Sequence, residues 1–292
     1  MQNGIEFAPV DVKIKSILTD KLKKIEKYLN SDVFTYWGPI FNGIEDVIKK
    51  IIEDLVAHPN GQNQEKLTVI LTTTGGSAEA VERIVNILRY HYAEVNFIVP
   101  NYAYSAGTIF CMSGDNIFMS YSSVLGPIDP QVQNKDGKYV AALGYLDKVN
   151  ELIEKAKNKN LTDAEFLILK DMDLAELRAY EQAKSLTIDL LNKWLVKYKF
   201  KNWTNHGNGN TVTTSEKQHR ASEIGDALSN TSIWRSHSRP INIAELQKLK
   251  LQIEDYSKTK EFCELIDGYH EMFNDYARKC GASNFFHTRR YI

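Results

Sequence analysis

A serine stands at position 105 in the stretch AYSAGT, between the apolar segment AEVNFIVP and the segment SAGTIFCMSG. We expect the first segment to be a buried strand and the second a short helix, so Ser105 lies at a strand-to-helix junction. A hydroxyl at such a junction, followed by the small residues Ala106 and Gly107, can act as a nucleophile beside a backbone N–H. A serine that only caps the helix is the alternative interpretation.

A second glycine-bearing turn, TTTGGSAEA, follows the β-rich run KLTVILTT (66–73). Gly75 and Gly76 leave this strand, and Ser77 begins a helix. Backbone N–H groups at the turn, together with the positive end of the helix, favour an anion or an oxyanion. A plain turn with Ser77 as the N-cap is again the alternative. Because open α/β sheets bind ligands where parallel strands end, the two turns together predict an oxyanion donor and a nucleophile at one site.

The segments around these turns predict an α/β fold with a parallel β-α-β core. Strands are expected at 66–73, 93–100 and 115–126, and amphipathic helical patterns fill the intervals and the stretch 41–58. Such alternation implies a parallel sheet with right-handed crossovers. From about residue 139 the chain reads as largely helical, with a polar loop at 201–214. We therefore divide it into three parts. Residues 1–60 form an N-terminal helical segment that packs on the core, and residues 61–255 form the catalytic domain, with a helical insertion at about 140–230. Residues 256–292 form a C-terminal helical extension.

The segments TTTGGSAEAVERIVNILR and AYSAGTIFCMSGDNIFMSYSSVLGPIDPQ resemble the core of the Clp-protease/crotonase superfamily of serine peptidases. The resemblance is nearest to the signal-peptide-peptidase branch and to the serine dehydrogenase proteinases; it covers 66–131 strongly and extends weakly through 236–255. It implies a ClpP/crotonase-like spiral core, Ser105 as the nucleophile, and oxyanion hydrogen bonds from Gly76 and Ala106. It also implies a peptide or protein substrate and a homo-oligomer.

The general base is where the sequence departs from the Clp pattern, because SSVLGPIDPQ holds no histidine. The signal-peptide-peptidase branch uses a desolvated lysine instead, and Lys148 follows Ser105 at a similar distance in a helical stretch. Lys138, in a polar loop, is a second lysine candidate for the base and lies nearer to Ser105 in the sequence. His237 in SHSRP is a third candidate, since histidine needs less tuning than lysine to act as a base at neutral pH. Asp129 could orient either base or only stiffen its turn.

Composition excludes several other functions. The net charge of −1 gives no global argument for nucleic-acid binding, and no apolar run is long enough to span a membrane. Three scattered cysteines and the lack of a signal-peptide pattern fit a cytoplasmic protein. Neither a metal-ligand motif nor a cofactor motif is present, so we expect no metal and no cofactor. Two alternatives stay open beside the peptidase: a crotonase-type acyl-thioester enzyme, and an inactive scaffold on the same fold.

Overall fold

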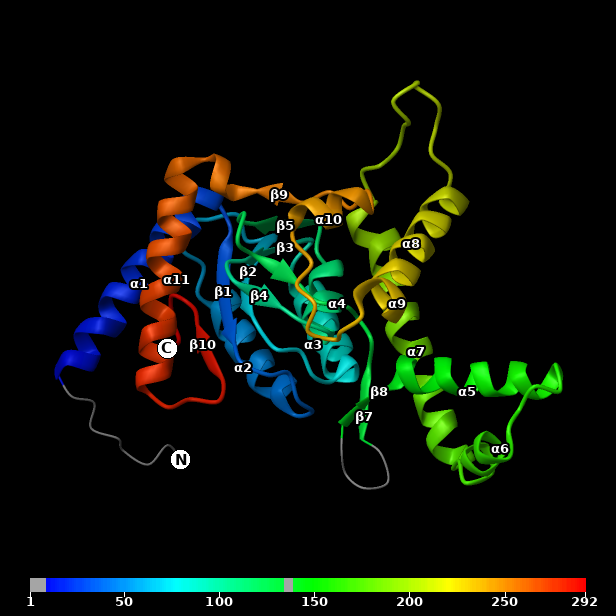
Figure 1. Ribbon diagram of the computed structural model, residues 1–292. Helices are drawn as coiled ribbons and strands as arrows, with labels where there is room; N and C mark the ends of the chain where they lie inside the picture. Colours follow the sequence, from blue (N-terminus) through cyan, green and yellow to red (C-terminus); the bar gives the residue numbers. More distant parts are fainter. Residues whose placement is uncertain (1–8, 134–138) are drawn as a thin grey trace. The chain divides into compact units, whose positions relative to one another are not determined.

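The computed structural model describes residues 9–133 and 139–292 and divides into two compact units (Figure 1). The first unit contains residues 1–125 and 241–292, and the second contains residues 126–240. The second unit is therefore an insertion in the chain of the first. Its two ends are joined in the first unit, where Leu125 and Ile241 exchange backbone hydrogen bonds of 2.9 and 2.8 Å.

The first unit is built on a six-stranded sheet in the order β10-β1-β2-β3-β5-β9, in which only β10 runs antiparallel to its neighbour. A separate parallel pair, β4-β6, lies beside the end of β2. Its strands are β1 (Asp32–Trp37), β2 (Lys66–Thr72), β3 (Glu94–Val99), β4 (Tyr102–Ala103), β5 (Asn116–Met119), β6 (Val124–Leu125), β9 (Glu254–Asp255) and β10 (Phe285–His287). The mixed α/β class with a mostly parallel sheet is as predicted; the ClpP/crotonase spiral stays a prediction.

Helices cover both faces of this sheet. They are α1 (Pro9–Leu29), α2 (Ile44–Ala57), α3 (Ala78–His91), α4 (Ala106–Met112), α10 (Ile243–Lys248) and α11 (Lys260–Lys279). Helices α1 and α11 lie side by side and bury Ile98 of β3 in their common core (Figure 1). The preceding residue, Phe97, points to the other face, as strand alternation requires. There its ring meets Phe110 of α4 edge-on, with the ring centres 4.7 Å apart.

Two neighbouring strands at one side of the sheet, β10 and β1, were not predicted. Residues 32–37 lie in the segment 1–60 that we expected to be helical, yet they form β1 and pair in parallel with β2 over six residues. The extension 256–292 likewise contributes β10, which pairs antiparallel with β1. The run at 115–126, expected as one strand, is divided into β5 and β6 by a turn at Ser120–Ser123. The other predicted strands and helices agree with the structure to within a few residues.

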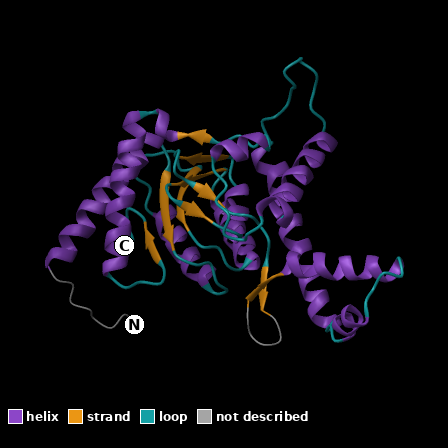
Figure 2. Cartoon of the chain, in the orientation of Figure 1, coloured by secondary structure: helices purple, strands orange, loops and turns teal. Residues whose placement is uncertain are grey.

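The second unit is mostly helical (Figure 2). Its elements are β7 (Gln131–Gln133), β8 (Tyr139–Ala141), α5 (Ala142–Lys157), α6 (Asp163–Lys170), α7 (Leu174–Trp194), a π-helical turn (Leu195–Lys199), α8 (Thr214–Ser229) and α9 (Thr231–Trp234). A small core of α5 and α7 side chains surrounds Tyr180, which is fully buried. Helices α6 and α8 begin with capping boxes at Thr162 and Thr213, so their start points follow from local sequence.

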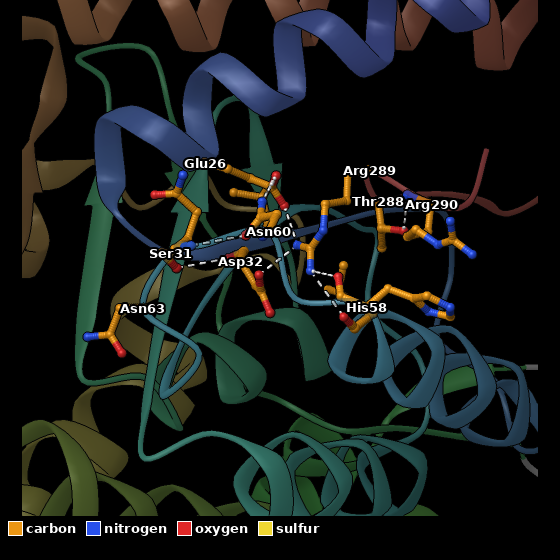
Figure 3. Close-up of polar contacts among 12 residues, drawn as sticks. Glu26, Ser31, Asp32, His58, Asn60, Asn63, Thr288, Arg289 and Arg290 are labelled. Atoms are coloured by element: carbon orange, nitrogen blue, oxygen red, sulfur yellow. Dashed lines mark hydrogen bonds and ion pairs between the residues drawn. The ribbon is translucent and has the colours of Figure 1, made fainter.

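The C-terminal tail HTRRYI is held in place by the buried side chain of Arg289. The side chain of Arg289 is only 4% exposed and contacts Glu26 at 2.8 Å and Asp32 at 2.6 Å (Figure 3). Its second terminal nitrogen donates to the carbonyl oxygens of Leu55 and His58, at the end of α2. The tail is thus fixed to the first unit by a buried ion-pair cluster. In the part of the chain that the structure describes, no helix has both the length and the apolar character needed to cross a membrane.

Candidate active site

The two glycine-bearing turns meet in the first unit. Just before them, the Thr73 N–H donates to the carbonyl of Tyr102 at 3.1 Å, and the Tyr104 N–H donates to the carbonyl of Thr73 at 3.0 Å. These bonds join the end of β2 to β4, and they fix the turn at Gly75 next to the turn at Ser105. The predicted meeting of the two turns is therefore observed.

Three glycines allow this close approach. A Cβ atom on Gly75 would lie 2.5 Å from the Tyr104 carbonyl oxygen and 2.9 Å from Cβ of Ser105. A Cβ atom on Gly107 would lie 2.4 Å from Cγ2 of Thr73, and one on Gly76 would lie 1.9 Å from the Ile40 carbonyl oxygen. Real Cβ contacts are not this short, so the two turns touch, and the Ile40 segment approaches Gly76, only because these side chains are absent.

Ser105 has a strained backbone and an unbonded hydroxyl. Its φ of 52° and ψ of −117° lie outside the regions that non-glycine residues favour. Within the described residues its side chain makes no capping hydrogen bond and has no other hydrogen-bond partner, and the residue is partly exposed. The capping interpretation of Ser105 is therefore wrong, whereas Ser77 does cap α3 by accepting from the Ala80 N–H at 3.0 Å. Strain of this kind persists where the surrounding structure holds it, and it is common at functional sites.

The backbone N–H groups beside Ser105 differ in their availability. The N–H of Gly75 donates to Oγ1 of Thr73 at 3.0 Å and is occupied. The N–H groups of Gly76 and Ala106 have no acceptor in the described part of the chain, and Gly76 is exposed. Gly75 therefore leaves room for Ser105 to approach, and the neighbouring N–H groups of Gly76 and Ala106 are left without an acceptor among the described residues.

A segment that the sequence analysis did not single out holds the Gly76 peptide. The Ile40 N–H donates to the Gly75 carbonyl at 2.8 Å, and the Ser77 N–H donates to the Ile40 carbonyl at 2.9 Å. Ile40 thus bonds on both sides of Gly76 as a short parallel bridge. The signal for it in the sequence is weak: the stretch GPIFNG contains turn residues but no strand-like alternation.

Lys148 lies in the second unit on the exposed face of α5. Its side chain is 58% exposed, and its Nζ atom forms an ion pair with Glu151 at 2.9 Å. A lysine works as a base only when it loses its proton, which requires desolvation or nearby positive charge. Lys148 has the surroundings of an ordinary surface lysine. Lys138, the other lysine candidate, lies outside the described residues.

His237, also in the second unit, lines a cavity of about 200 Å³. Its Nδ1 atom is buried and has no hydrogen-bond partner in the described part of the chain, and burial lowers the pKa of the ring. Asp129 lines the same cavity and accepts from the Leu143 N–H at 3.1 Å, and burial raises its pKa to about 6. The other lining residues are Pro127, Gly144, Ser229, Trp234, Arg235 and Ser236. A cavity that holds two groups with perturbed pKa values is typical of a functional site.

The described residues contain no group of three or more His, Cys, Asp or Glu side chains suited to hold a metal ion. The two turns instead bring a serine and backbone N–H groups close together, and these are the group types that acyl transfer uses.

Comparison with known proteins agrees with this chemistry. Residues 31–278 match the family described as ClpP-like SDH-type serine proteinase. Two uncharacterized proteins of Methanocaldococcus jannaschii, MJ0137 and MJ1495, are each 28% identical to this chain, over 73% and 70% of its length. The matched parts span 61% and 56% of those relatives' own lengths. The family match covers most of the chain, including both turns at Ser105, and the chain belongs to the family of ClpP-like SDH-type serine proteinases.

Proposed function

We propose that this chain hydrolyses peptide bonds with Ser105 as the nucleophile. The observation that carries the proposal is a strained serine that, among the described residues, has no hydrogen-bond partner and lies near two amides without acceptors. Ser105 Oγ attacks the peptide carbonyl carbon and gives its proton to a base, while the Gly76 and Ala106 N–H groups bind the oxyanion. The C–N bond then breaks, the amine leaves with a proton, and water hydrolyses the acyl-serine ester.

We assign the base to His237 in preference to Lys148. Burial keeps the imidazole neutral, and therefore able to accept a proton, at pH values below the ordinary histidine pKa of 6.5. The ring also offers a buried Nδ1 atom without a hydrogen-bond partner among the described residues, whereas Lys148 is exposed and paired with Glu151.

The nucleophile is tested with a fluorophosphonate probe and a fluorogenic peptide library. We expect the wild-type chain to be labelled at Ser105 and to cleave peptides, and Ser105→Ala to abolish both. Ser113→Ala is the matched control, because it removes a hydroxyl at the other end of α4 that only donates to Phe110. Equal labelling of wild type and Ser105→Ala, or no labelling of the wild type, refutes the assignment and favours the scaffold alternative.

The base is tested by the pH profile of the labelling rate. We expect His237→Gln to lower the rate by about 100-fold at neutral pH, within the usual contribution of a general base. Lys148→Met should leave the rate within a factor of two. The reverse pattern would transfer the role to Lys148.

Peptide or protein substrates and a homo-oligomeric state are part of the proposal. Light scattering of the purified chain measures the oligomeric state directly, and a single protomer mass would remove that part while leaving the assignment of Ser105 unchanged.

A further inference from the structure

The C-terminal strand β10 contacts the segment that holds the oxyanion turn. Strand β10 pairs with β1 so that Phe285 lies opposite Trp37, and this places Asn284 alongside Gly38. Gly38 has a φ of 128°, and a Cβ atom on it would lie 2.5 Å from the Ser283 carbonyl oxygen and 2.7 Å from Nδ2 of Asn284. The approach of Asn284 to β1 therefore depends on the glycine.

Asn284 donates two hydrogen bonds at this point. Its Nδ2 atom donates to the Pro39 carbonyl oxygen at 2.8 Å and to the Tyr36 hydroxyl at 2.6 Å. The Tyr36 hydroxyl in turn donates to the same Pro39 oxygen at 2.5 Å. Tyr36 is only 1% exposed, and burial raises the pKa of its hydroxyl. The Pro39 carbonyl thus accepts from two buttressing groups, one of which is fully packed in the core.

The Pro39 carbonyl and the Ile40 N–H belong to one planar peptide unit. That N–H donates to the Gly75 carbonyl at 2.8 Å, and the Gly75 carbonyl shares a second planar unit with the Gly76 N–H. A continuous relay therefore runs from the Asn284 amide through two rigid peptide units to the N–H proposed to bind the oxyanion. Each bond in such a chain polarises the next, so the relay both orients the Gly76 N–H and makes it a better donor.

We propose that Asn284 is a positioning residue for catalysis, acting through Pro39 and Ile40 on the Gly76 N–H. The proposal rests on the proposed function, because it gives Gly76 the role of oxyanion donor. Asn284 itself need not touch substrate. Its effect should appear in the transition state, where the oxyanion carries its charge, and not in substrate binding.

The kinetic test compares Asn284→Ala with wild type on a cleaved peptide. Loss of an oxyanion donor costs about 100- to 1,000-fold in kcat, so weakening one through the relay should cost about tenfold. KM should stay unchanged, and affinity for a peptide aldehyde, which forms a tetrahedral adduct, should fall in parallel with kcat. Tyr36→Phe removes one of the two bonds to the Pro39 oxygen and should give a smaller loss in the same direction.

Asn60→Ala is the matched control. It removes an amide that donates to Glu26 at 2.8 Å near the opposite end of β1, beside the ion pairs that fix the C-terminal tail (Figure 3). If it lowers kcat as much as Asn284→Ala does, general loosening of the tail explains the effect and the relay is wrong. An unchanged kcat in Asn284→Ala, or a change confined to KM, also overturns it.

Hydrogen exchange separates the relay from the proposed function because it needs no turnover. In Asn284→Ala, the Ile40 and Ser77 amides, which donate across the bridge, should exchange faster than in wild type, with the amides of β3 unchanged. If exchange is faster in Asn284→Ala but the wild type has no peptidase activity, the proposed function is refuted and the mechanical link from Asn284 to Gly76 stands. Unchanged exchange refutes the link whatever the activity.

Discussion

Replacing Gly107 by alanine should damage the site far more than it damages the fold. The added Cβ atom would lie 2.4 Å from Cγ2 of Thr73, so the two groups must separate by about 1 Å to reach the shortest common contact. Thr73 cannot easily turn aside. It is 1% exposed, and its Oγ1 accepts from the Gly75 N–H. The strand end carrying Thr73 and the helix start carrying Ser105 must therefore move apart.

Two opposing effects set the stability change. Overpacking a core costs about 1–3 kcal/mol, whereas alanine in place of a helical glycine returns about 1 kcal/mol. We expect a net loss of at most about 2 kcal/mol and a melting temperature lower by at most about 4 °C. The effect on reactivity is larger, because a displacement of about 1 Å at a reacting group can cost about 100-fold in rate.

The assay is the rate of fluorophosphonate labelling, with thermal unfolding measured on the same samples. Thr73→Ser removes Cγ2 but keeps the hydroxyl that accepts from Gly75, so the double variant with Gly107→Ala should regain most of the labelling rate. Gly268→Ala in α11 is the control: its nearest neighbour would be the mobile end of Lys21 at 3.4 Å, and it should leave labelling unchanged. If Gly107→Ala is labelled at the wild-type rate, the proposed geometry is refuted. It is also refuted if the double variant is labelled no faster than the two single changes predict when they act independently.

Two further variants test the buried ionisable groups. Because burial raises the pKa of Asp129 from its ordinary 3.8 to about 6, the protonated form stabilises the fold and this contribution is lost as pH rises through that range. Asp129→Asn keeps the acceptor for the Leu143 N–H. In thermal unfolding it should therefore be more stable than wild type at pH 8 and no more stable at pH 4. An equal difference in stability between variant and wild type at both pH values would contradict this. Arg289→Met leaves Glu26 and Asp32 buried without a cation, and chemical denaturation should show a loss of about 3–5 kcal/mol. Adding Glu26→Gln and Asp32→Asn to Arg289→Met should restore most of the lost stability. If stability is not restored, the loss came from the packing of the tail and not from the unpaired charges.

The sequence predicted the central part of the fold because local signals there agree with one another. The run KLTVILTT is apolar and β-branched, it stops at two glycines, and a helical stripe follows at once. Strand β1 was missed although DVFTYW consists mostly of β-branched and aromatic residues, which favour strands. It is only six residues long and directly follows a long helix, so it was included in the helical segment. The three residues of β10 carry little local signal, and their position depends on pairing with β1, about 250 residues earlier in the chain.

The same distinction applies to the site. Ser105, Gly76 and Ala106 could be proposed from the sequence because a hydroxyl and backbone amides lie in two short motifs that follow strands. Ile40 and Asn284 could not, because their roles come from hydrogen bonds across the sheet edge and not from their residue types. The surroundings of Lys148 could not be predicted either. Its place in a helical stretch did not reveal which face it occupies, and the structure presents this position to solvent, next to Glu151.

Stability alone does not account for the structure around Ser105. A non-glycine residue at this φ and ψ costs about 1–3 kcal/mol, and glycine would relieve the strain. The Gly76 and Ala106 N–H groups have no acceptor among the described residues, and the Ser105 hydroxyl does not bond to them. Yet the surroundings hold this conformation closely, through the backbone bonds of Thr73 and the absence of three Cβ atoms. Within the described residues, hydroxyl and amides are thus kept unpaired and close together at a cost in stability, as the proposed stabilisation of an acyl transition state requires.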